Sequence, residues 1–381
     1  MKIMISAGEA SGDLHGANLA KKLKELCPNA ELFGMGGTQM AEAGVEILQP
    51  IDELGVMGLV EGIGLLRKLF KIRDRMLNEL KERKADVLVV IDYAEYNTSL
   101  AKKAYKMGIP VVFYISPSAW AWRKGRAKDI AKITDRVASI FPFEAEVYSE
   151  AGANVTYVGH PLVDIVKPTR TLEEARQFFH MDPEKQQVLL MPGSRKHEIE
   201  KVLPFMLDAA EILYDKDQKL EFFLPLASTI PEECIASLTV NRKISLRLIR
   251  GNTYDLMIAC HAGMITSGTA CLEAALLGIP SVIVYRVTPL TYYIGRQLYK
   301  KSHFGLPNII VEEPFLPELL QHDVTGPNMA EAISPWLYQP EEREKVKGQL
   351  AHMKERLGGG GAVGRAAEVV LEVARERKGA D

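Results

Sequence analysis

Short runs of apolar and β-branched residues alternate along the chain with longer segments in which apolar residues recur every three or four positions. The short runs are typical of buried strands, and the longer segments are typical of amphipathic helices. In the first part of the chain the pattern predicts strands at residues 2–6, 31–34, 87–91, 111–115, 137–140 and 155–158. Helices are expected between most of them, for instance at residues 17–26 and 98–107. This alternation indicates parallel sheets built from βαβ units.

A polar, turn-rich passage from residue 159 to 183 interrupts the alternation, which then begins again. The second series predicts helices at residues 199–214 and 269–277 and strands at residues 188–191, 221–224, 245–249, 263–266 and 281–285. We therefore expect an α/β protein with two Rossmann-like domains, at residues 1–165 and 185–350, whose parallel sheets face each other across an interdomain cleft. Ligands of such sheets bind beyond the carboxyl ends of the strands, so the loops after strands are where chemistry is expected.

Four consecutive glycines, at residues 358–361, precede a last helix that we expect at residues 362–378. Val369, Val370 and Val373 give this helix an apolar face that needs a surface to cover. The helix can cross back to the first domain or pack on a partner subunit of a homodimer. The sequence leaves both arrangements open.

The overall composition narrows the class of protein. The chain has 381 residues and a formal net charge of −2, which argues against a nucleic-acid-binding protein. Its cysteines lack the spacing of a zinc site, and they fit reduced thiols in the cytoplasm: Cys27, Cys234, Cys260 and Cys271. The N-terminus enters a strand without the pattern of a signal peptide, and the long uncharged run at 256–272 is interrupted by polar residues. We therefore expect a cytoplasmic protein that does not span a membrane.

The first expected strand ends in a loop with the sequence GEASGD, which contains Glu9, Ser11 and Asp13. Its glycines allow a tight turn and close approach of the backbone to a ligand, while Ser11 and Asp13 can cap the following helix. The loop does not match GxGxxG, which argues against a dinucleotide-binding enzyme. A ligand-binding loop and a simple capped turn both remain open.

The expected strand at 87–91 runs directly into Asp92, followed by Glu95 and by Asn97, which we expect to contact the acceptor. Two carboxylates at the end of a strand are candidates for a general base that removes a proton from a reacting hydroxyl. The alternative is that Asp92 or Glu95 only caps the helix expected from about Thr98.

In the second half, the strand at 188–191 is followed by Pro192, Gly193, Ser194 and Arg195. A small turn that opens a helix offers free backbone N–H groups to a phosphate, and an arginine can bind the same phosphate bidentately. The alternative is a surface arginine beside a turn. We expect Arg195 to stabilise the charge that develops on a departing diphosphate.

A second helix start of this kind follows the strand at 263–266 and consists of Ser267, Gly268 and Thr269. Glu273 lies one helical turn further on, where a carboxylate could accept hydrogen bonds from ribose hydroxyls. Arg286 and Asn308 are weaker candidates for contacts with the same ligand, because each also fits an ordinary turn.

Neither a metal ion nor another cofactor is expected. The Asp-x-Asp pair at Asp215 and Asp217 ends an amphipathic helix in a polar stretch, which indicates a solvated turn.

A segment near residues 57–76 combines an apolar stripe with basic neighbours. The apolar residues are Leu59, Ile63, Leu66, Leu69 and Phe70, and the basic ones include Arg67, Lys68 and Lys71. Such a helix can lie in the interface of an anionic membrane, although an ordinary core-packed helix has the same periodicity. Trp120 and Trp122 could form an apolar wall for acyl chains or belong to a domain core.

Taken together, these segments resemble the lipid-A-disaccharide synthases, glycosyltransferase family 19. The resemblance covers almost the whole chain and depends on the order of many short blocks. These are AGEASGD at 7–13, VMGLVE at 56–61, DYAEYN at 92–97, SPSAWAWR at 116–123, PFE at 142–144, VGHPL at 158–162, PGSR at 192–195, SGTACLE at 267–273, YR at 285–286 and LPN at 306–308.

The resemblance implies a GT-B fold with an N-terminal acceptor domain and a C-terminal UDP-sugar domain. It implies inverting transfer of 2,3-diacylglucosamine from UDP-2,3-diacylglucosamine to the 6-hydroxyl of 2,3-diacylglucosamine 1-phosphate, without a metal. The family works on the cytoplasmic face of the inner membrane of Gram-negative bacteria. Asp92 then matches an essential aspartate, Arg195 the diphosphate arginine, and Glu273 and Asn308 donor-site positions. The segment near residues 57–76 matches the part of the family thought to meet the membrane.

One departure from the family pattern concerns the candidate base. This chain has Ala94 and Glu95 where relatives have proline and aspartate, so the division of labour between Asp92 and Glu95 is open. Alternative functions are a UDP-N-acetylglucosamine 2-epimerase, another GT-B transferase, and a non-catalytic nucleotide-sugar binder.

Overall fold

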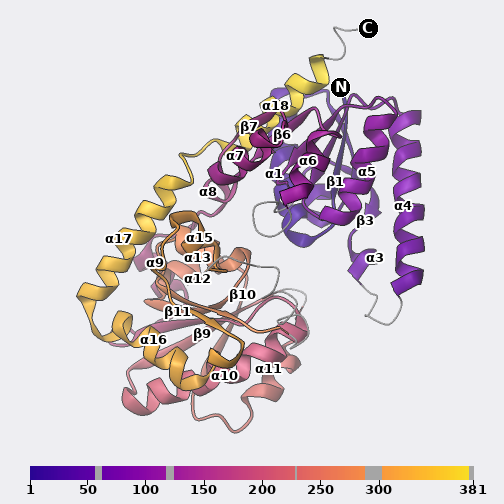
Figure 1. Cartoon of the computed structure of the whole chain (residues 1–381). Helices are drawn as coiled ribbons and strands as arrows, with labels where there is room; N and C mark the ends of the chain where they lie inside the picture. Colours follow the sequence, from indigo (N-terminus) through magenta and orange to yellow (C-terminus); the bar gives the residue numbers. More distant parts are fainter. Residues whose placement is uncertain (56–61, 117–123, 228–229, 288–302, 377–381) are drawn as a thin grey trace. The chain divides into compact units, whose positions relative to one another are not determined.

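The computed structural model of the chain describes residues 1–55, 62–116, 124–227, 230–287 and 303–376. The chain divides into two compact units, Met1–Asp164 with Gly359–Asp381, and Ile165–Gly358. Each unit is built around one parallel sheet (Figure 1).

The first unit contains a seven-stranded parallel sheet with the order β3-β2-β1-β4-β5-β6-β7. Its strands are β1 (Lys2–Ala7), β2 (Glu31–Gly36), β3 (Glu46–Pro50), β4 (Val87–Ile91), β5 (Val111–Tyr114), β6 (Arg136–Ser139) and β7 (Val155–Tyr157). Its helices are α1 (Ala10–Leu26), α2 (Thr38–Glu42), α3 (Asp52–Gly55), α4 (Gly62–Glu82), α5 (Ala94–Lys106), α6 (Lys124–Ala131), α7 (Pro142–Glu150), α18 (Ala362–Glu376) and, at the boundary of the unit, α8 (Leu162–Ile165).

The central strand β4 is buried on both faces, which explains its uninterrupted apolar sequence. Leu88 and Val90 belong to a core cluster that also contains Met76 of α4 and Leu100 of α5. On the opposite face, α18 packs against α1 and contacts β4, β5 and β6 (Figure 1). The terminal helix is therefore part of the first unit.

Asp164 fixes the start of α18. Its carboxylate accepts hydrogen bonds from the backbone N–H groups of Gly361 (2.6 Å) and Val363 (3.0 Å). Arg365 of the same helix donates to the carbonyl oxygen of Val158 at 2.9 Å. These bonds tie residues about 200 positions apart in the chain.

The second unit contains a six-stranded parallel sheet with the order β10-β9-β8-β11-β12-β13. Its strands are β8 (Gln186–Met191), β9 (Leu220–Leu226), β10 (Leu246–Arg250), β11 (Ala262–Thr266), β12 (Ser281–Tyr285) and β13 (Glu318–Leu320). Its helices are α9 (Leu172–Phe178), α10 (Lys196–Lys216), α11 (Glu232–Thr239), α12 (Thr253–Ala259), α13 (Thr269–Leu276), α15 (Leu306–Val311), α16 (Gly326–Tyr338) and α17 (Pro340–Arg356), with a short 3-10 helix at Gln321–Asp323.

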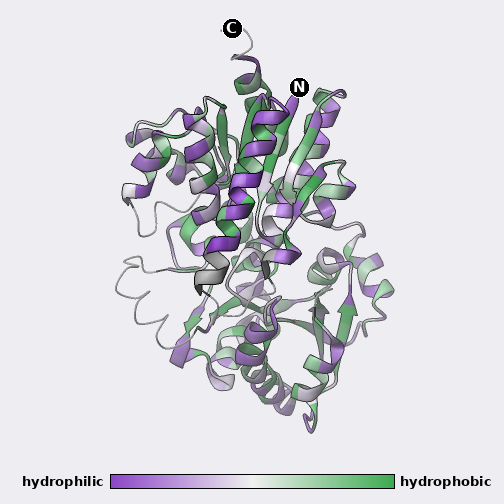
Figure 2. Cartoon of the chain, turned by 90° about the vertical axis from the view of Figure 1, so that its right-hand side faces the viewer, coloured by the Kyte–Doolittle hydropathy of each residue, from purple (hydrophilic) through white to green (hydrophobic). Residues whose placement is uncertain are grey.

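The prediction of an α/β fold with two parallel, Rossmann-like sheets is confirmed. Two edge strands, β3 and β13, were not predicted, because they are short and do not carry a continuous apolar run. The helix expected at 17–26 begins at Ala10, and the helix expected at 98–107 begins at Ala94. Figure 2 shows the apolar strands inside each unit and helices whose polar residues face outward.

Candidate active site

The candidate residues of the first unit follow two neighbouring strands. β1 pairs with β4, and Ala7 is the register partner of Ile91, so the loops that begin at Gly8 and Asp92 lie side by side. The strand order reverses between β1 and β4, because the chain continues outward in opposite directions from these two strands. A reversal of this kind is where ligands of open α/β sheets bind.

Strained backbone marks the strand ends at this position. Asp92 and Tyr93 have φ values of 46° and 47°, and Ile115, after the adjacent strand β5, has a φ of 60°. The backbone N–H of Asp92 donates to the carbonyl oxygen of Ile115 at 3.1 Å. Positive φ is rare for residues other than glycine, and such strain collects at functional sites.

Asp92 is the carboxyl group whose surroundings best suit a base. Burial raises its pKa, and the nearby carboxylate of Glu9 raises it further, while a hydrogen bond from the backbone of Tyr93 opposes the shift. Asp92 is not a helix cap, since Tyr93 occupies the N-cap position of α5 and makes no side-chain cap hydrogen bond. A base with an elevated pKa works closer to neutral pH.

Glu95 has a different environment. It lies in the first turn of α5, and its side chain is 81% exposed. Arg126 of α6 donates to its Oε1 at 2.5 Å. Oε1 of Glu95 is thus already engaged in a charge-assisted hydrogen bond with a guanidinium.

Asn97 is fully buried, and its side chain makes hydrogen bonds to other residues of the first unit. Its Nδ2 donates to the carbonyl oxygens of Ser6, Ile91 and Asp92 at 3.1, 3.0 and 2.8 Å, and its Oδ1 accepts from the Ser6 hydroxyl at 2.7 Å. The expectation of an acceptor contact by Asn97 does not fit this geometry, because every polar atom of the side chain already has a partner. Asn97 instead joins the ends of β1 and β4.

Asp13 also has a structural role, because its side chain binds backbone groups of the same unit. It lies inside α1 and is buried, so it does not cap that helix. Its carboxylate accepts from the backbone N–H groups at the start of α2, those of Gly37 (2.7 Å), Gln39 (3.1 Å) and Met40 (3.1 Å). Ser11 lies partly exposed in the first turn of α1, and Glu9 precedes that helix as its exposed N-cap residue.

Glu144 was not predicted as a site residue. It lies in the first turn of α7 and is buried, and burial raises its pKa to about 8. The hydroxyl of Ser116 lies 3.5 Å from its Oε2, and the negative charge of Asp92 adds to the shift. The carboxyl group of Glu144 therefore binds a proton more readily than an exposed glutamate does. The only sequence signal was its place in the PFE block after a strand.

In the second unit the two expected phosphate-binding turns also follow neighbouring strands. β8 ends before Gly193, β11 ends before Ser267, and these two strands pair with Ile265 opposite Met191. The strand order reverses between them as well. The N-termini of α10 and α13 are therefore adjacent at one edge of one sheet, and both present backbone N–H groups.

Arg195 is the N-cap residue of α10, and its side chain is 62% exposed. Its Nη1 donates to Oε1 of Glu198 at 3.2 Å, while the backbone N–H groups of Ser194 and Arg195 donate to Oε2 at 3.2 and 3.3 Å. Gly193 has a φ of 121°, which only glycine adopts readily. The turn thus already holds one carboxylate, the chemistry expected of an anion site.

Around Ser267, Gly268 and Thr269 the structure contains an unsatisfied polar group. The hydroxyl of Thr266, the last residue of β11, is buried and has no hydrogen-bond partner within the described part of the chain. Gly268 precedes α13 with a φ of 154° and is exposed. A buried hydroxyl without a partner is rare in proteins.

Glu273 lines a cavity of about 390 Å³ in the second unit, together with Lys167, Thr169, Asn252, Thr253, Tyr254 and Asp255. The hydroxyl of Tyr254 lies 3.3 Å from Oε1 of Glu273. Burial raises the pKa of Glu273, and this hydrogen bond opposes the shift. Tyr254 was not predicted, since α12 carries no phosphate or sugar motif.

Arg286 and Asn308, the two weaker candidates for donor contacts, differ in how far other residues already bind their side chains. The guanidinium of Arg286 lies over the ring of Phe205 with 4.2 Å to the centroid. Asn308 is fully buried; its Nδ2 donates to Leu316 O and Glu318 Oε1, and its Oδ1 accepts from the N–H groups of Phe315 and Leu316. The expected donor contact by Asn308 does not fit these contacts, because they satisfy the side chain completely.

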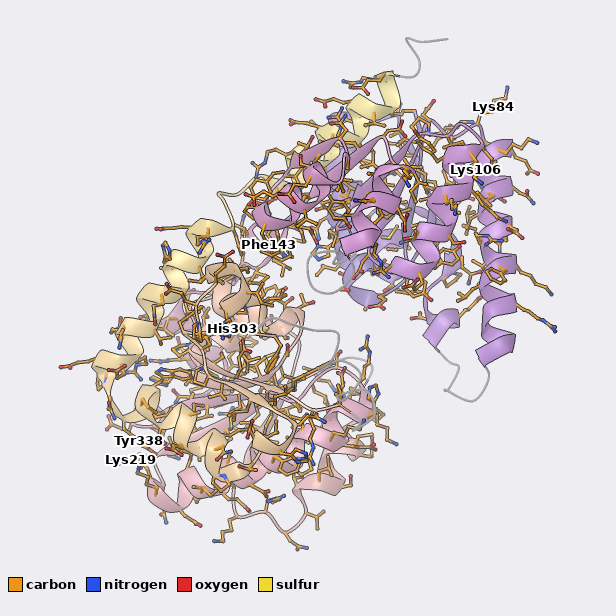
Figure 3. The ribbon with its side chains drawn as sticks, in the orientation of Figure 1. Lys84, Lys106, Phe143, Lys219, His303 and Tyr338 are labelled. Carbon is orange, nitrogen blue, oxygen red and sulfur yellow. The ribbon has the colours of Figure 1, made fainter. Side chains whose placement is uncertain are left out.

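The expected membrane segment is described in part. Leu59, Trp120 and Trp122 lie outside the described residues, as do the side chains of Ile63 and Leu66. Within α4, Leu69 packs against the core cluster, whereas Phe70 is 49% exposed and lies under the guanidinium of Arg73. Arg67 and Lys71 are exposed, and Lys68 donates to the carbonyl oxygen of Glu53. Lys106 is the last residue of α5 and Lys84 follows the C-terminus of α4, so both lie at the C-terminal ends of these helices (Figure 3).

The described residues contain neither a membrane-spanning helix nor a cluster of metal-binding side chains. None of their helices is long and apolar enough to cross a bilayer. Within the same ranges, no three histidine, cysteine, aspartate or glutamate side chains form a group that could hold a metal ion.

Two units, each built on a parallel Rossmann-like sheet, have the architecture of the GT-B fold. The fold matches UDP-GlcNAc 2-epimerase from Neisseria meningitidis (TM-score 0.69, 14% identity, 98% of this chain and 100% of the other). It also matches MurG from Acinetobacter baumannii (TM-score 0.60, 14% identity, 97% and 99%). At these identities the likeness concerns the fold alone.

The sequence identifies the family within this class. The profile of the lipid-A-disaccharide synthetase family matches residues 3–369, and the chain belongs to that family. It is 41% identical to the lipid-A-disaccharide synthase of Geobacter metallireducens over 377 residues (99% of this chain, 98% of the relative). It is 42% identical to that of Geobacter sulfurreducens over 372 residues (98% and 97%).

Proposed function

We propose that this chain is a UDP-sugar-dependent transferase that makes the lipid A disaccharide. It transfers 2,3-diacylglucosamine from UDP-2,3-diacylglucosamine to the 6-hydroxyl of 2,3-diacylglucosamine 1-phosphate, which gives a β-1,6-linked disaccharide 1-phosphate and UDP. Membership of the family across residues 3–369 supports this reaction. The same membership disfavours an epimerase or a non-catalytic binder.

Asp92 is the base in this proposal. Its carboxylate takes the proton of the 6-hydroxyl while that oxygen attacks the anomeric carbon, and the bond from this carbon to the diphosphate breaks with its electron pair leaving on UDP. The observation that carries the assignment is the partly buried, strained position of Asp92 at the strand reversal, where burial and Glu9 raise its pKa. Glu95 is less suited, because it is exposed and bound by Arg126.

The donor's diphosphate binds at the adjacent N-termini of α10 and α13, with Arg195 as its cation. Charge grows on the leaving phosphate oxygen during the reaction, so N–H groups and a guanidinium there stabilise the transition state more than the ground state. Support comes from the pairing of β8 with β11, which brings the two helix starts together. Glu273 and Tyr254, in the adjoining cavity, bind the ribose hydroxyls.

The protein acts at the cytoplasmic surface of the inner membrane, where its diacylated substrates are found. The exposed ring of Phe70 and the neighbouring basic residues Arg67 and Lys71 support contact of α4 with anionic lipid. Binding to vesicles with and without anionic lipid tests this contact. Phe70→Ser should weaken binding to the anionic vesicles, and an unchanged affinity would remove α4 from the interface.

The reaction is tested by release of UDP from mixtures of the two diacyl sugars. Asp92→Asn should abolish turnover and leave UDP binding intact, since the amide cannot accept the proton. Arg195→Ala should weaken UDP binding and lower the rate together, because a lost charge-assisted contact is worth about 1.5–3 kcal/mol. A normal rate in Asp92→Asn excludes Asp92 as the base. Turnover of UDP-N-acetylglucosamine alone would show an epimerase, and UDP binding without release a binder.

A further inference from the structure

Tyr93 has an energetically unfavourable backbone directly beside Asp92. Its φ and ψ are 47° and 55°, and the preceding φ of Asp92 is 46°. The left-handed conformation costs about 1–2 kcal/mol for a residue with a side chain. Two such residues in succession persist only if contacts of their side chains or backbone enforce the turn.

The ring of Tyr93 supplies such a contact with the loop after β1. A methyl group placed on Gly8 would come within 2.7 Å of three ring carbons of Tyr93, so the ring lies directly on the glycine backbone. Gly8 is buried. Its φ is not among the positive values in the chain, so the space taken by the ring, rather than the backbone conformation, requires glycine here.

The position of this ring is also set from the core. Its centroid lies 5.7 Å from that of Tyr96, with 38° between the ring planes. Tyr96 is buried in the core cluster of the first unit, and Tyr93 packs against the same cluster. The Tyr93 ring thus connects the core beneath α5 to the loop that carries Glu9.

Both carboxylates of the site are close to this contact. After burial, the charge of Glu9 is the second cause that raises the pKa of Asp92, and the same two causes raise the pKa of Tyr93. The backbone of Asp92 is already held by Asn97 on one side and Ile115 on the other. Asn97 and the strand pairing join the ends of β1 and β4, and beyond these ends the ring of Tyr93 contacts the backbone of Gly8, next to Glu9.

We propose that Tyr93 is a positioning residue for the base: its ring, resting on Gly8, holds the left-handed turn that sets Asp92 against the Glu9 loop. The inference rests on the proposed role of Asp92. It concerns the geometry of the base and not its identity.

Four variants test the contact from both sides: Tyr93→Ala, Tyr93→Phe, Gly8→Ala and the double variant Gly8→Ala with Tyr93→Ala. UDP release is measured at varied acceptor concentration. Tyr93→Phe should stay within about twofold of wild type, because the ring remains. Tyr93→Ala and Gly8→Ala should each lower kcat roughly 10- to 100-fold with little change in KM, as expected when a base is displaced by about 1 Å.

The double variant decides the matter. Without the ring, the methyl group at Gly8 has nothing to collide with, so the double variant should be no worse than Tyr93→Ala alone. Gly348→Ala in α17 is the matched control, because a methyl group there meets no atom within 4 Å. The proposal would be overturned if the fold-decrease in kcat of the double variant were the product of the two single decreases. It would also be overturned if Tyr93→Phe lowered kcat as much as Tyr93→Ala.

Two comparisons separate a folding defect from a loss of catalysis: Tyr93→Ala with Tyr93→Phe, and Asp92→Asn with Tyr93→Ala. If Gly8→Ala does not fold, the kcat of Tyr93→Ala is compared with that of Tyr93→Phe at a temperature at which both variants are folded. Equal kcat values of these two variants refute the proposal. If Asp92→Asn keeps its rate, the proposed role of Asp92 fails. If Asp92→Asn is inactive while Tyr93→Ala is normal, only the role of Tyr93 fails.

Discussion

Replacement of Asp13 tests the hydrogen bonds that attach α2 to α1. The Oδ1 atom accepts from the N–H groups of Gly37 and Met40, and Oδ2 accepts from that of Gln39. Asp13→Ala removes all three acceptors in a buried place. A buried donor without a partner costs about 1–3 kcal/mol, and partial access of water should limit the total loss of stability to about 3–5 kcal/mol.

Asp13→Asn is the informative companion variant. Its amide oxygen can replace Oδ1 and keep two of the three bonds, while its NH₂ group faces the N–H of Gln39. We expect a loss of about 1.5–3 kcal/mol, one charge-assisted bond exchanged for a donor–donor contact. The exposed Glu25, which pairs with Lys22 in the same helix, serves as control, and Glu25→Gln should leave the unfolding midpoint unchanged.

Denaturant unfolding and hydrogen exchange together measure this loss. Since a chain with two units need not unfold in one step, exchange of the peptide that covers residues 36–42 reports the local effect directly. Exchange there should accelerate in the order wild type, Asp13→Asn, Asp13→Ala. A loss below about 1 kcal/mol for Asp13→Ala, or equal effects of the two variants, would refute the reasoning.

Three further predictions concern buried polar groups of both units. Burial lowers the pKa of His15 to about 4 and that of His160 to about 3, below the value of about 6.5 for unfolded histidine, so stability present above pH 6.5 should be lost as the pH falls toward 4. Urea midpoints at pH 7, 6 and 5 measure this loss, and a flat profile contradicts it. Burial raises the pKa of Glu144 to about 8, so the native state binds more protons than the unfolded state between about pH 4.5 and 8, and wild-type stability should fall as the pH rises through that range. As the pH rises, the free energy of unfolding of Glu144→Gln should therefore increase relative to that of the wild type, by roughly 1.4 kcal/mol per pH unit at most. A pH-independent difference between the two unfolding midpoints contradicts the assignment. Asn308→Ala should lower the melting temperature of the second unit, because four hydrogen bonds of a buried side chain are lost, and UDP affinity should be nearly unchanged in the folded fraction. A normal melting temperature with weakened UDP binding would show a direct donor contact.

The alternation of apolar runs was sufficient to predict most of the fold. β4 and β11 are buried along their whole length; β4 is apolar throughout and β11 up to Thr266, so both could be recognised directly. The edge strands β3 and β13 have one side open, and their short mixed sequences carry no comparable signal. The same pattern also placed Asp92, Arg195 and Ser267 in loops after strands, because a change from apolar to polar residues marks the end of a strand.

What the sequence by itself determined was the class of fold, the family, and the loops in which chemistry belongs. The tertiary structure decided which polar side chains remain available. Asp13, Asn97 and Asn308 are occupied by hydrogen bonds within the protein, most of them to backbone groups, whereas Asp92 lies at a strand reversal and Glu273 lines a cavity. The physical reason is that a carboxylate or amide accepts the same hydrogen bonds from a helix end as from a ligand. Composition and spacing cannot distinguish these partners, because the groups that satisfy Asp13 and the ring that lies on Gly8 are brought there by strand pairing and helix packing.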